Sequence, residues 1–446
     1  MNILSYIQSK LNLSTTKTKV LSNIYWAVLG KCVNLLGSLF VGILVARYLG
    51  AEQYGLMNYV ISIVSIFQVF ADFGLDSIQI REEAKNKELR DRLIGTTFAL
   101  KLFFAVIAVA LIFVYTVLFE ADSLTQSLIF IYSASVILNT TWVARNHFTS
   151  IVMNKHVVQT EITRTIVGMI IKVVLLLCHA SLIYFILALV FDAVLLASGY
   201  LLSYSRTVDS VFKWRFDLHL AAYLIKQSFP LLLSGAAIVV YHRIDQVMIG
   251  KILDDSSVGI YSVAVRFVEV LVFMPTIISQ TVSPVLVKIQ SEDKLRYTRQ
   301  SQLFMNITVW LCIFAAVLVA FVAYPLVALT FGQQYIMAAS VLSIMAFKVI
   351  GDALSQTSGQ LIIIEKRQKY VSLRNVFGCI VCIGLNLSVI QQYGIYGAAV
   401  VAIITIFASG TMANLMIPSY RKFFKMQMQS LIFGWRDLAN IMEVMR

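Results

Sequence analysis

The sequence predicts an all-α polytopic membrane protein with twelve transmembrane helices, arranged as two parallel-repeat six-helix bundles around a central cavity. Three observations lead to this fold class. Of the 446 residues, 59% are hydrophobic and only 13% are charged, and the mean hydropathy of +0.81 lies outside the range of soluble domains. Apolar stretches long enough to cross a bilayer recur along the whole chain. The two halves of the chain also resemble each other.

The spanning helices follow from runs of about 20 apolar residues, because a helix rises 1.5 Å per residue across a hydrocarbon layer about 30 Å thick. Polar or charged residues separate most of these runs, and a very tight turn separates two of them at residues 179–181. The predicted spans lie near residues 20–47, 55–80, 93–118, 124–147, 161–178, 182–204, 223–250, 258–286, 302–330, 337–363, 371–390 and 394–420.

The distribution of basic residues predicts the orientation of the chain. With the N-terminus in the cytoplasm, 28 of the 36 lysines and arginines fall in inward segments, six fall within spans, and only Arg47 and Lys251 fall in outward loops. Cytoplasmic loops are rich in Lys and Arg, so we expect both termini to be cytoplasmic. The net charge of +13 is divided among short loops rather than gathered on one face, which argues against a nucleic-acid partner.

The internal repeat is carried by short matching segments. Residues 46–57 align without gaps to residues 250–261, with Gly55 matched to Gly259. Arg164 and Gly168 recur as Arg374 and Gly378. Offsets of 204 and 210 residues at equivalent places predict a duplicated bundle with both copies in one orientation. We therefore expect an N-terminal bundle with a cytoplasmic leader at 1–210 and a C-terminal bundle with a cytoplasmic tail at 211–446.

Six basic side chains fall inside the predicted spans. A lysine or arginine at the centre of a bilayer helix costs roughly 2.5 to 3.5 kcal/mol, so these residues must face a wet cavity or acidic partners rather than lipid. This pattern indicates a membrane protein that carries an anionic substrate. The six residues are Lys31, Lys101, Lys172, Arg243, Arg266 and Lys348.

In the first half, these bases come with few acids. Lys31 shares a polar helix face with Asn34, Lys172 shares one with Arg164, and Asp192 is the natural counter-ion for a lysine of this half. We expect the uncompensated positive charge of the protein to lie here. The alternative for any one lysine is a snorkelling side chain or a hydrogen bond between helices.

The bases of the second half come with nearby acids. Arg266 and Glu269 are three residues apart, and Lys348 and Asp352 four apart, so each pair can meet on its own helix. Structural ion pairs are the leading interpretation. Arg243 and Asp245 point to different sides of their helix, so at least one needs a partner elsewhere.

Signals for an enzyme are weak. The sequence contains no pattern for a zinc protease, dinucleotide fold, serine hydrolase or P-loop, and the five histidines lack metal-ligand spacing. Cys379 and Cys382 form a CxxC in the middle of a helix, without a second pair. Asp72 and Asp76, four residues apart, are interpreted as a helix-end charge cluster with the bases that follow them. We therefore expect no catalytic residue, no metal and no cofactor.

Three segments resemble the polysaccharide flippases of the Wzx type, within the multidrug/oligosaccharidyl-lipid/polysaccharide exporter superfamily. They are LVARYLGAEQYGLMNY at 44–59, FGLDSIQIRE at 73–82 and RIDQVMIGKILDDSSVGIYSVAVRFVE at 243–269. The resemblance extends over nearly the whole chain. It implies a flippase that moves an undecaprenyl-pyrophosphate-linked oligosaccharide, such as an O-antigen or capsule repeat unit, from the inner to the outer leaflet of the bacterial plasma (inner) membrane. It also implies alternating access driven by an ion gradient.

On this interpretation the partners are the lipid-linked oligosaccharide, membrane lipid, a proton or sodium as coupling ion, and the glycan polymerase and chain-length regulator. Two alternatives remain, a multidrug antiporter of the same superfamily and a membrane glycan polymerase or glycosyltransferase. The candidate coupling residues are Asp245, Glu269 and Asp352. The candidate substrate-binding residues are Lys31, Asn34, Lys101, Lys172, Arg243, Arg266 and Lys348.

Overall fold

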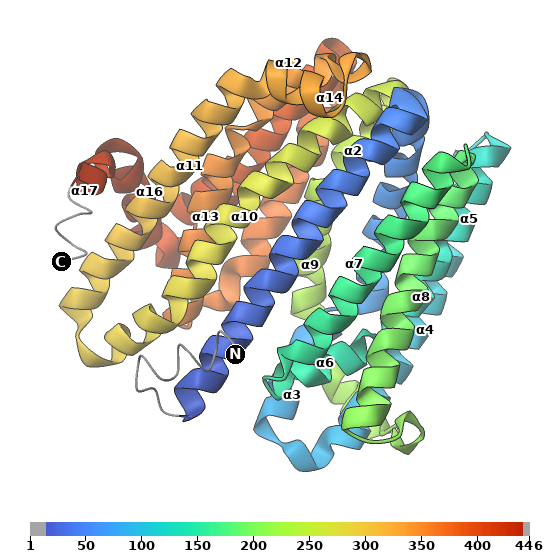
Figure 1. Cartoon of the computed structure of the whole chain (residues 1–446). Coiled ribbons are helices and arrows are strands. Elements are labelled where there is room, and N and C mark those ends of the chain that lie inside the picture. The colour runs from blue at the N-terminus through green and yellow to red at the C-terminus, as the bar shows by residue number, and fades with distance from the viewer. Residues whose placement is uncertain (1–14, 440–446) are drawn as a thin grey trace, which may run out of the picture. The chain divides into compact units, whose positions relative to one another are not determined.

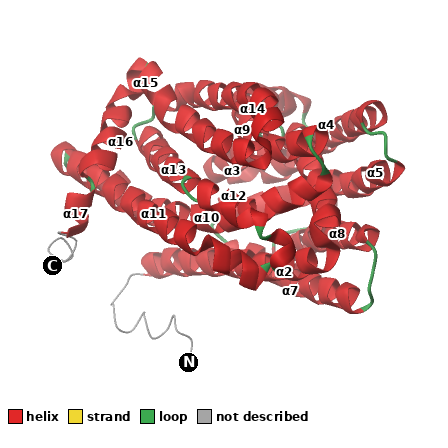
Figure 2. Ribbon diagram, turned by 90° about the horizontal axis from the view of Figure 1, so that it is seen from above, coloured by secondary structure: helices red, strands yellow, loops and turns green. Residues whose placement is uncertain are grey.

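The computed structural model of the protein describes residues 15–439, without the side chains of residues 15–29, 31–33, 35, 87 and 438–439. Within this range the chain is helical and contains no β-strand (Figure 2). The predicted all-α class is therefore confirmed. The chain forms two compact units, and the boundary between them is not a single point in the sequence. Unit 1 comprises residues 1–48 and 67–232, and unit 2 comprises residues 49–66 and 233–446.

Two long helices belong partly to each unit, namely α2 (Thr15–Asp72) and α9 (Leu218–Ile252). The other helices of unit 1 are α3 (Leu75–Lys85), α4 (Arg90–Phe119), α5 (Ser123–Leu138), α6 (Trp142–Ser150), α7 (Asn154–Leu177) and α8 (Leu182–Thr207). Those of unit 2 are α10 (Asp255–Glu292), α11 (Lys294–Thr330), α12 (Met337–Met345), α13 (Lys348–Ile364), α14 (Val371–Phe407), α15 (Ala413–Met416), α16 (Arg421–Phe433) and α17 (Trp435–Ala439) (Figure 1).

The number of spans agrees with the prediction. Nine helices of the described part are long and apolar enough to cross a membrane. Two of them contain a sharp kink, at Gly50 and at Gly394, where a positive φ breaks the helical path and leaves two helices end to end. Dividing these two, and adding the 24-residue helix α7, gives twelve spans. α7 begins at Asn154, before the predicted start at 161, because its first turns carry polar residues that are helical but not apolar.

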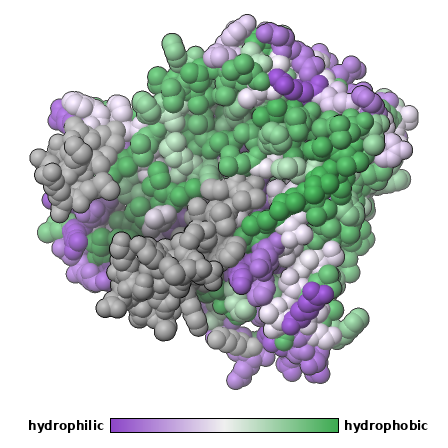
Figure 3. All heavy atoms as spheres, viewed as in Figure 1, coloured by the Kyte–Doolittle hydropathy of each residue, from purple (hydrophilic) through white to green (hydrophobic). Residues whose placement is uncertain are grey.

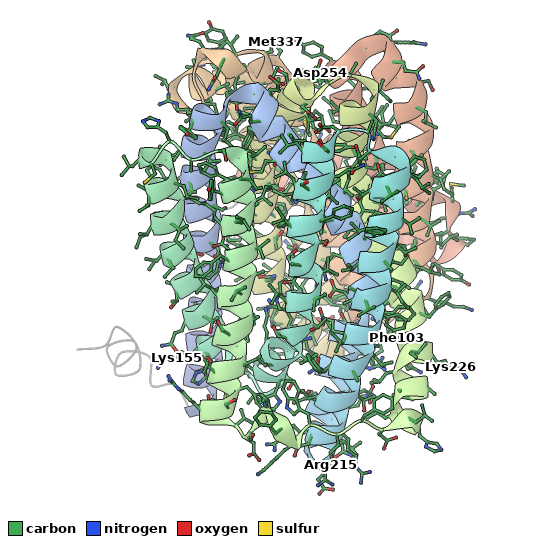
Figure 4. All side chains as sticks on the ribbon, turned by 90° about the vertical axis from the view of Figure 1, so that its right-hand side faces the viewer. Phe103, Lys155, Arg215, Lys226, Asp254 and Met337 are labelled. Carbon is green, nitrogen blue, oxygen red and sulfur yellow. The ribbon has the colours of Figure 1, made fainter. Side chains whose placement is uncertain are left out.

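The outer surface of the helices is apolar where lipid would cover it. On α4, Phe103, Phe113 and Leu118 are 59%, 56% and 69% exposed, a degree of apolar exposure that a soluble protein would not tolerate along one helix. Hydrophobic side chains cover the middle of the face in Figure 3, and hydrophilic ones gather toward its upper and lower ends. In unit 1, Lys155 and Arg215 lie toward the lower end of the helices in Figure 4.

The two glycines of the internal repeat pack against each other's backbone in unit 2. A Cβ on Gly55 would lie 1.7 Å from the carbonyl oxygen of Asp255, and a Cβ on Gly259 would lie 2.0 Å from that of Ala51. Any larger residue would force two helix backbones apart. The repeat detected in the sequence therefore marks a close helix crossing at which only glycine fits.

Candidate functional site: a charged cavity in unit 2

A cavity of about 370 Å³ lies inside unit 2 and collects residues that the sequence singled out separately. Arg243, Asp245, Glu269 and Lys348 line it, from helices α9, α10 and α13. A volume of this size holds an ion with its water shell but not an oligosaccharide. The arrangement therefore suits ion binding better than sugar binding.

Ion pairs link most of the charges around the cavity. Arg243 Nη2 lies 3.6 Å from Glu269 Oε1, and Arg266 Nη1 lies 3.3 Å from Glu269 Oε2. Lys348 Nζ lies 2.9 Å from Asp352 Oδ2, with both side chains largely buried. The two pairs expected on single helices are thus confirmed. The partner that Arg243 needs is Glu269 on the neighbouring helix.

Asp245 differs from the other acids because only uncharged groups hold it. Its carboxylate accepts hydrogen bonds from Tyr261 Oη at 2.9 Å and from Asn386 Nδ2 at 2.7 Å, and Cys382 Sγ lies 3.4 Å away. The residue is 4% exposed, and no described lysine or arginine lies within salt-bridge distance of it. A buried carboxylate without a cationic partner is free to take up a proton or a metal cation.

Sequence reasoning missed the three residues that hold Asp245. Tyr261 gave no signal because buried tyrosines are common in apolar helices. Cys382 and Asn386 are four residues apart on α14 and therefore share a face, but the CxxC pattern drew attention to the wrong pair of positions.

Sequence reasoning also missed Arg374, which was counted with the bases of an inward segment rather than with the six bases within the spans. It lies in the first turns of α14, where its side chain is 7% exposed. Nη2 lies 3.4 Å from Ser355 Oγ, whereas Nε and Nη1 have no hydrogen-bond partner among the described residues. Its electrostatic neighbours are Tyr241 and Tyr420 rather than a carboxylate. Because a guanidinium stays charged, Arg374 is a buried cation without a counter-charge among the described residues.

Unit 1 neutralises its deep lysine Lys101 with two carboxylates. Lys101 is 1% exposed, and its Nζ lies 2.6 Å from Asp76 Oδ1 and 3.2 Å from Asp72 Oδ1. The interpretation of Asp72 and Asp76 as a helix-end cluster with the following bases is wrong, because Asp72, at the end of α2, and Asp76, on α3, both pair with Lys101 on α4. Asn146 Nδ2 also donates to Asp76 Oδ1, at 2.7 Å.

Lys172 also has a carboxylate partner. Its Nζ lies 2.5 Å from Asp192 Oδ2 on α8, which confirms the counter-ion expected from the sequence. Gly168, one turn earlier on α7, leaves room for this carboxylate, since a Cβ there would lie 2.2 Å from Asp192 Oδ1. The expectation that the first half holds uncompensated positive charge is therefore wrong for Lys101 and Lys172. The acids that match them come from helices that the spacing along one helix could not reveal.

Asn34 belongs to a polar cluster between α2 and α7. Its Nδ2 donates to Glu161 Oε2 at 3.2 Å, and its Oδ1 accepts from Arg164 Nη2 at 3.2 Å and from Thr165 Oγ1. Arg145 Nε lies 3.5 Å from the same glutamate. The side chain of Lys31 lies outside the described residues, so its predicted role is not addressed by these contacts.

The comparison with family models matches residues 20–290 to the family described as polysaccharide biosynthesis protein. A comparison with curated proteins finds no match. Among solved structures, the lipid II flippase MurJ in an inward closed conformation is similar over 94% of this chain and 93% of its own, with a TM-score of 0.67 at 16% identity.

Two other solved transporters share the fold. An inward-facing multidrug resistance MATE transporter of the MOP superfamily is similar over 89% of this chain and 96% of its own, with a TM-score of 0.67 at 13% identity. A MOP superfamily transporter from Pyrococcus furiosus is similar over 95% and 96%, with a TM-score of 0.59 at 12% identity. At these identities the likeness shows the fold alone, and it confirms the predicted architecture. Because the family match covers more than half of the chain, this multi-pass membrane protein belongs to the polysaccharide biosynthesis protein family and has the fold of MOP superfamily transporters.

Proposed function

We propose that the protein is a Wzx-type flippase that moves a polyprenyl-pyrophosphate-linked oligosaccharide from the inner to the outer leaflet of the bacterial plasma membrane. Both termini lie in the cytoplasm, and residues 1–210 and 211–446 form the two repeats. The protein works by alternating access and draws its energy from an ion gradient. The glycan polymerase and chain-length regulator act on the same substrate and are the expected protein partners.

The observation that carries this proposal is the unmatched guanidinium of Arg374 in a chain of the polysaccharide biosynthesis family. A buried arginine with two unpartnered nitrogens, Nε and Nη1, needs an anion, and arginine suits phosphate because its planar fork can donate two parallel hydrogen bonds. A guanidinium would repel the cationic substrates of a drug exporter. The likeness to a lipid II flippase, whose name describes a lipid-linked substrate, supports the same substrate class.

The substrate contacts are proposed in two groups. In unit 1, Lys31, Asn34 and Lys172 meet the pyrophosphate or the first sugar, with Lys172 exchanging Asp192 for a phosphate oxygen. Lys101 would have to leave two carboxylates at once, so its proposed contribution is weaker. In unit 2, Arg374 binds the phosphate, and Arg243, Arg266 and Lys348 are further contacting bases.

For ion coupling, Asp245 is the leading candidate. It alone among the three proposed acids has no basic partner, so binding of a proton or sodium requires no ion pair to break. Glu269 and Asp352 are secondary candidates, because each would first have to release an arginine or lysine.

The second candidate function is a multidrug antiporter. It is favoured by the two carboxylates of unit 1, Asp72 and Asp76, which are 29% and 32% exposed at their side chains while they hold Lys101. Carboxylates that face water suit a cationic drug.

A deletion strain complemented with wild-type protein or with Arg374→Gln distinguishes these functions. A flippase predicts that surface glycan is lost on deletion, restored by the wild type and not by the variant, with unchanged drug sensitivity. Intact surface glycan in the deletion strain, together with increased sensitivity to cationic drugs, would contradict the flippase and support the antiporter.

A further inference from the structure

An open groove of about 1200 Å³ lies in unit 2 between α11, α16 and α17, and we call it the basic groove. Its floor includes Gln302 and Met426, and its edges carry Arg299, Arg421 and Lys425. Figure 1 shows α16 and α17 beside α11. The groove is separate from the charged cavity, which is lined by α9, α10, α12, α13 and α14.

The charge of the groove is positive and largely unmatched. Four basic residues and a single acid line it. Lys422 is already paired with Glu365, with Nζ 2.8 Å from Oε1, and the acid Asp437 accepts a hydrogen bond from Asn306 at 2.6 Å. Arg299 and Lys425 form no salt bridge with a described residue, and both are exposed. Together with Arg421, they leave three cationic groups facing the groove.

The groove is held in shape by buried hydrogen bonds. Gln427 on α16 donates from Nε2 to the carbonyl oxygens of Leu354, at 3.0 Å, and Gly410, at 2.9 Å. Gln302 Nε2 donates to Met426 O at 3.1 Å, and Trp310 Nε1 donates to Ser430 O at 2.9 Å. These contacts fix α16 against α11 and α13, so the backbone that carries the basic side chains is held in place.

Aromatic side chains lie just beyond the residues that line the groove, at the end of α16 and the start of α17. Phe433 and Trp435 are about half exposed, and the guanidinium of Arg436 lies 5.2 Å and 5.5 Å from their ring centroids. Trp310, within the spanning helix α11, donates from Nε1 to Ser430 O and lies against Gly434, which places these aromatic residues beside the span. Aromatic rings next to basic side chains at the end of a span are typical of contact with the interfacial layer of a bilayer.

We propose that the basic groove binds the phosphate headgroup of an anionic phospholipid, with Arg299, Arg421 and Lys425 around the phosphate and with Phe433 and Trp435 beside the upper acyl chains. Charge alone would also suit an acidic protein segment. The aromatic side chains beside the span of α11 favour a lipid, because a lipid presents a phosphate and a hydrocarbon chain at the same place. This binding site is independent of the transported substrate.

The test compares lipid retention by the full-length protein, purified from vesicles that contain equal amounts of phosphatidylglycerol and phosphatidylcholine. Native mass spectrometry then counts the lipids of each kind that remain bound. The groove variant is Arg299→Gln with Lys425→Gln. The matched control is Lys294→Gln with Arg296→Gln, which removes two exposed charges from the start of the same helix α11 but outside the groove.

We expect the wild type and the control pair to retain phosphatidylglycerol in preference to phosphatidylcholine, and the groove variant to lose roughly tenfold or more of that preference. An equal loss in the control pair would reduce the effect to a general surface potential and overturn the proposal. Equal retention of the two lipids by the wild type would overturn it as well. So would binding of a polyglutamate peptide that the groove variant abolishes, without lipid selectivity, since that marks a protein-docking surface.

Discussion

The two units treat buried charge in different ways. In unit 1, Lys101 and Lys172 each lie against carboxylates that come from other segments of the chain. Unit 2 also contains two buried charges without an ion-pair partner among the described residues. Asp245 accepts hydrogen bonds only from uncharged groups, and Arg374 Nε and Nη1 have no hydrogen-bond partner. A matched charge stabilises the fold, whereas an unmatched one is costly unless a ligand completes it. On the proposed function, the difference predicts that Asp245 and Arg374 are the charges that a bound ion and an anionic substrate complete in unit 2.

The largest loss of stability should follow from removing both carboxylate partners of Lys101. Asp72→Asn with Asp76→Asn leaves a lysine that is 1% exposed without a counter-charge, which should destabilise the protein by about 3 to 5 kcal/mol. The thermal unfolding temperature in detergent and the yield of folded protein measure this. Asp91→Asn, which removes an exposed partner of Arg90, is the control and should change little. A double variant as stable as the wild type would remove the contrast between the units.

Next in size is the effect of filling the glycine crossing of unit 2. Gly259→Ala places a methyl group against the backbone at Ala51 and should destabilise the protein by about 1 to 3 kcal/mol. Gly235→Ala on α9 meets nothing within 4 Å and should be neutral or stabilise by up to about 1 kcal/mol, as expected for a helical glycine. Thermal unfolding of the two variants side by side measures the difference. Equal stability would show that the two helices separate easily at this crossing.

A third comparison sets Asp245 against Asp192. Asp245→Asn removes a charge held only by neutral groups, so the folded protein should remain stable while transport loses its dependence on the ion gradient. Asp192→Asn leaves Lys172 without its counter-charge and should lower stability by more than Asp245→Asn does. Unfolding temperature and gradient-driven transport in vesicles are measured for both. Gradient-dependent transport by Asp245→Asn at the wild-type rate would exclude this residue from coupling.

The smallest effect concerns Asp122, which caps α5 in unit 1. Hydrogen bonds from the hydroxyl and the backbone N–H of Thr125, at 2.7 Å and 2.8 Å, hold the pKa of Asp122 below its ordinary value. A lowered folded-state pKa contributes stability above the unfolded pKa, near 4, and this is lost as pH falls through the folded value. Asp122→Ala should therefore lower the unfolding temperature slightly at neutral pH and hardly at all in strong acid. A pH-independent difference between variant and wild type would contradict this role of the ionised carboxylate.

Much of the fold could be predicted from the sequence because lipid imposes a simple rule on each span. Apolar length gave the twelve helices, and the repeated Gly55 and Gly259 marked equivalent positions that meet in a helix crossing. Pairs on one helix, such as Lys348 with Asp352, were also predictable, since the distance between them is fixed by helix geometry.

The partners that come from different helices could not be predicted in this way. Asp72 at the end of α2 and Asp76 on α3 meet Lys101 only because both segments lie against α4, and Asn386 meets Asp245 across more than a hundred residues of sequence. Arg374 was counted with the bases of an inward segment because apolar length does not show whether a residue at the start of a span is buried. The unmatched charges therefore became visible only in three dimensions.

The most direct test of the account measures flipping of a fluorescent polyprenyl-pyrophosphate oligosaccharide by the full-length protein in vesicles, with Arg374→Gln, Arg374→Lys and the wild type at equal amounts. Loss of charge-assisted hydrogen bonds to a phosphate predicts a fall of roughly tenfold or more for glutamine and a smaller fall for lysine. The unfolding temperature of Arg374→Gln should stay the same or rise, because an unmatched buried charge has been removed. Flipping at the wild-type rate by Arg374→Gln, or lost flipping that is accompanied by lost stability, would contradict the claim that this guanidinium awaits an anionic substrate.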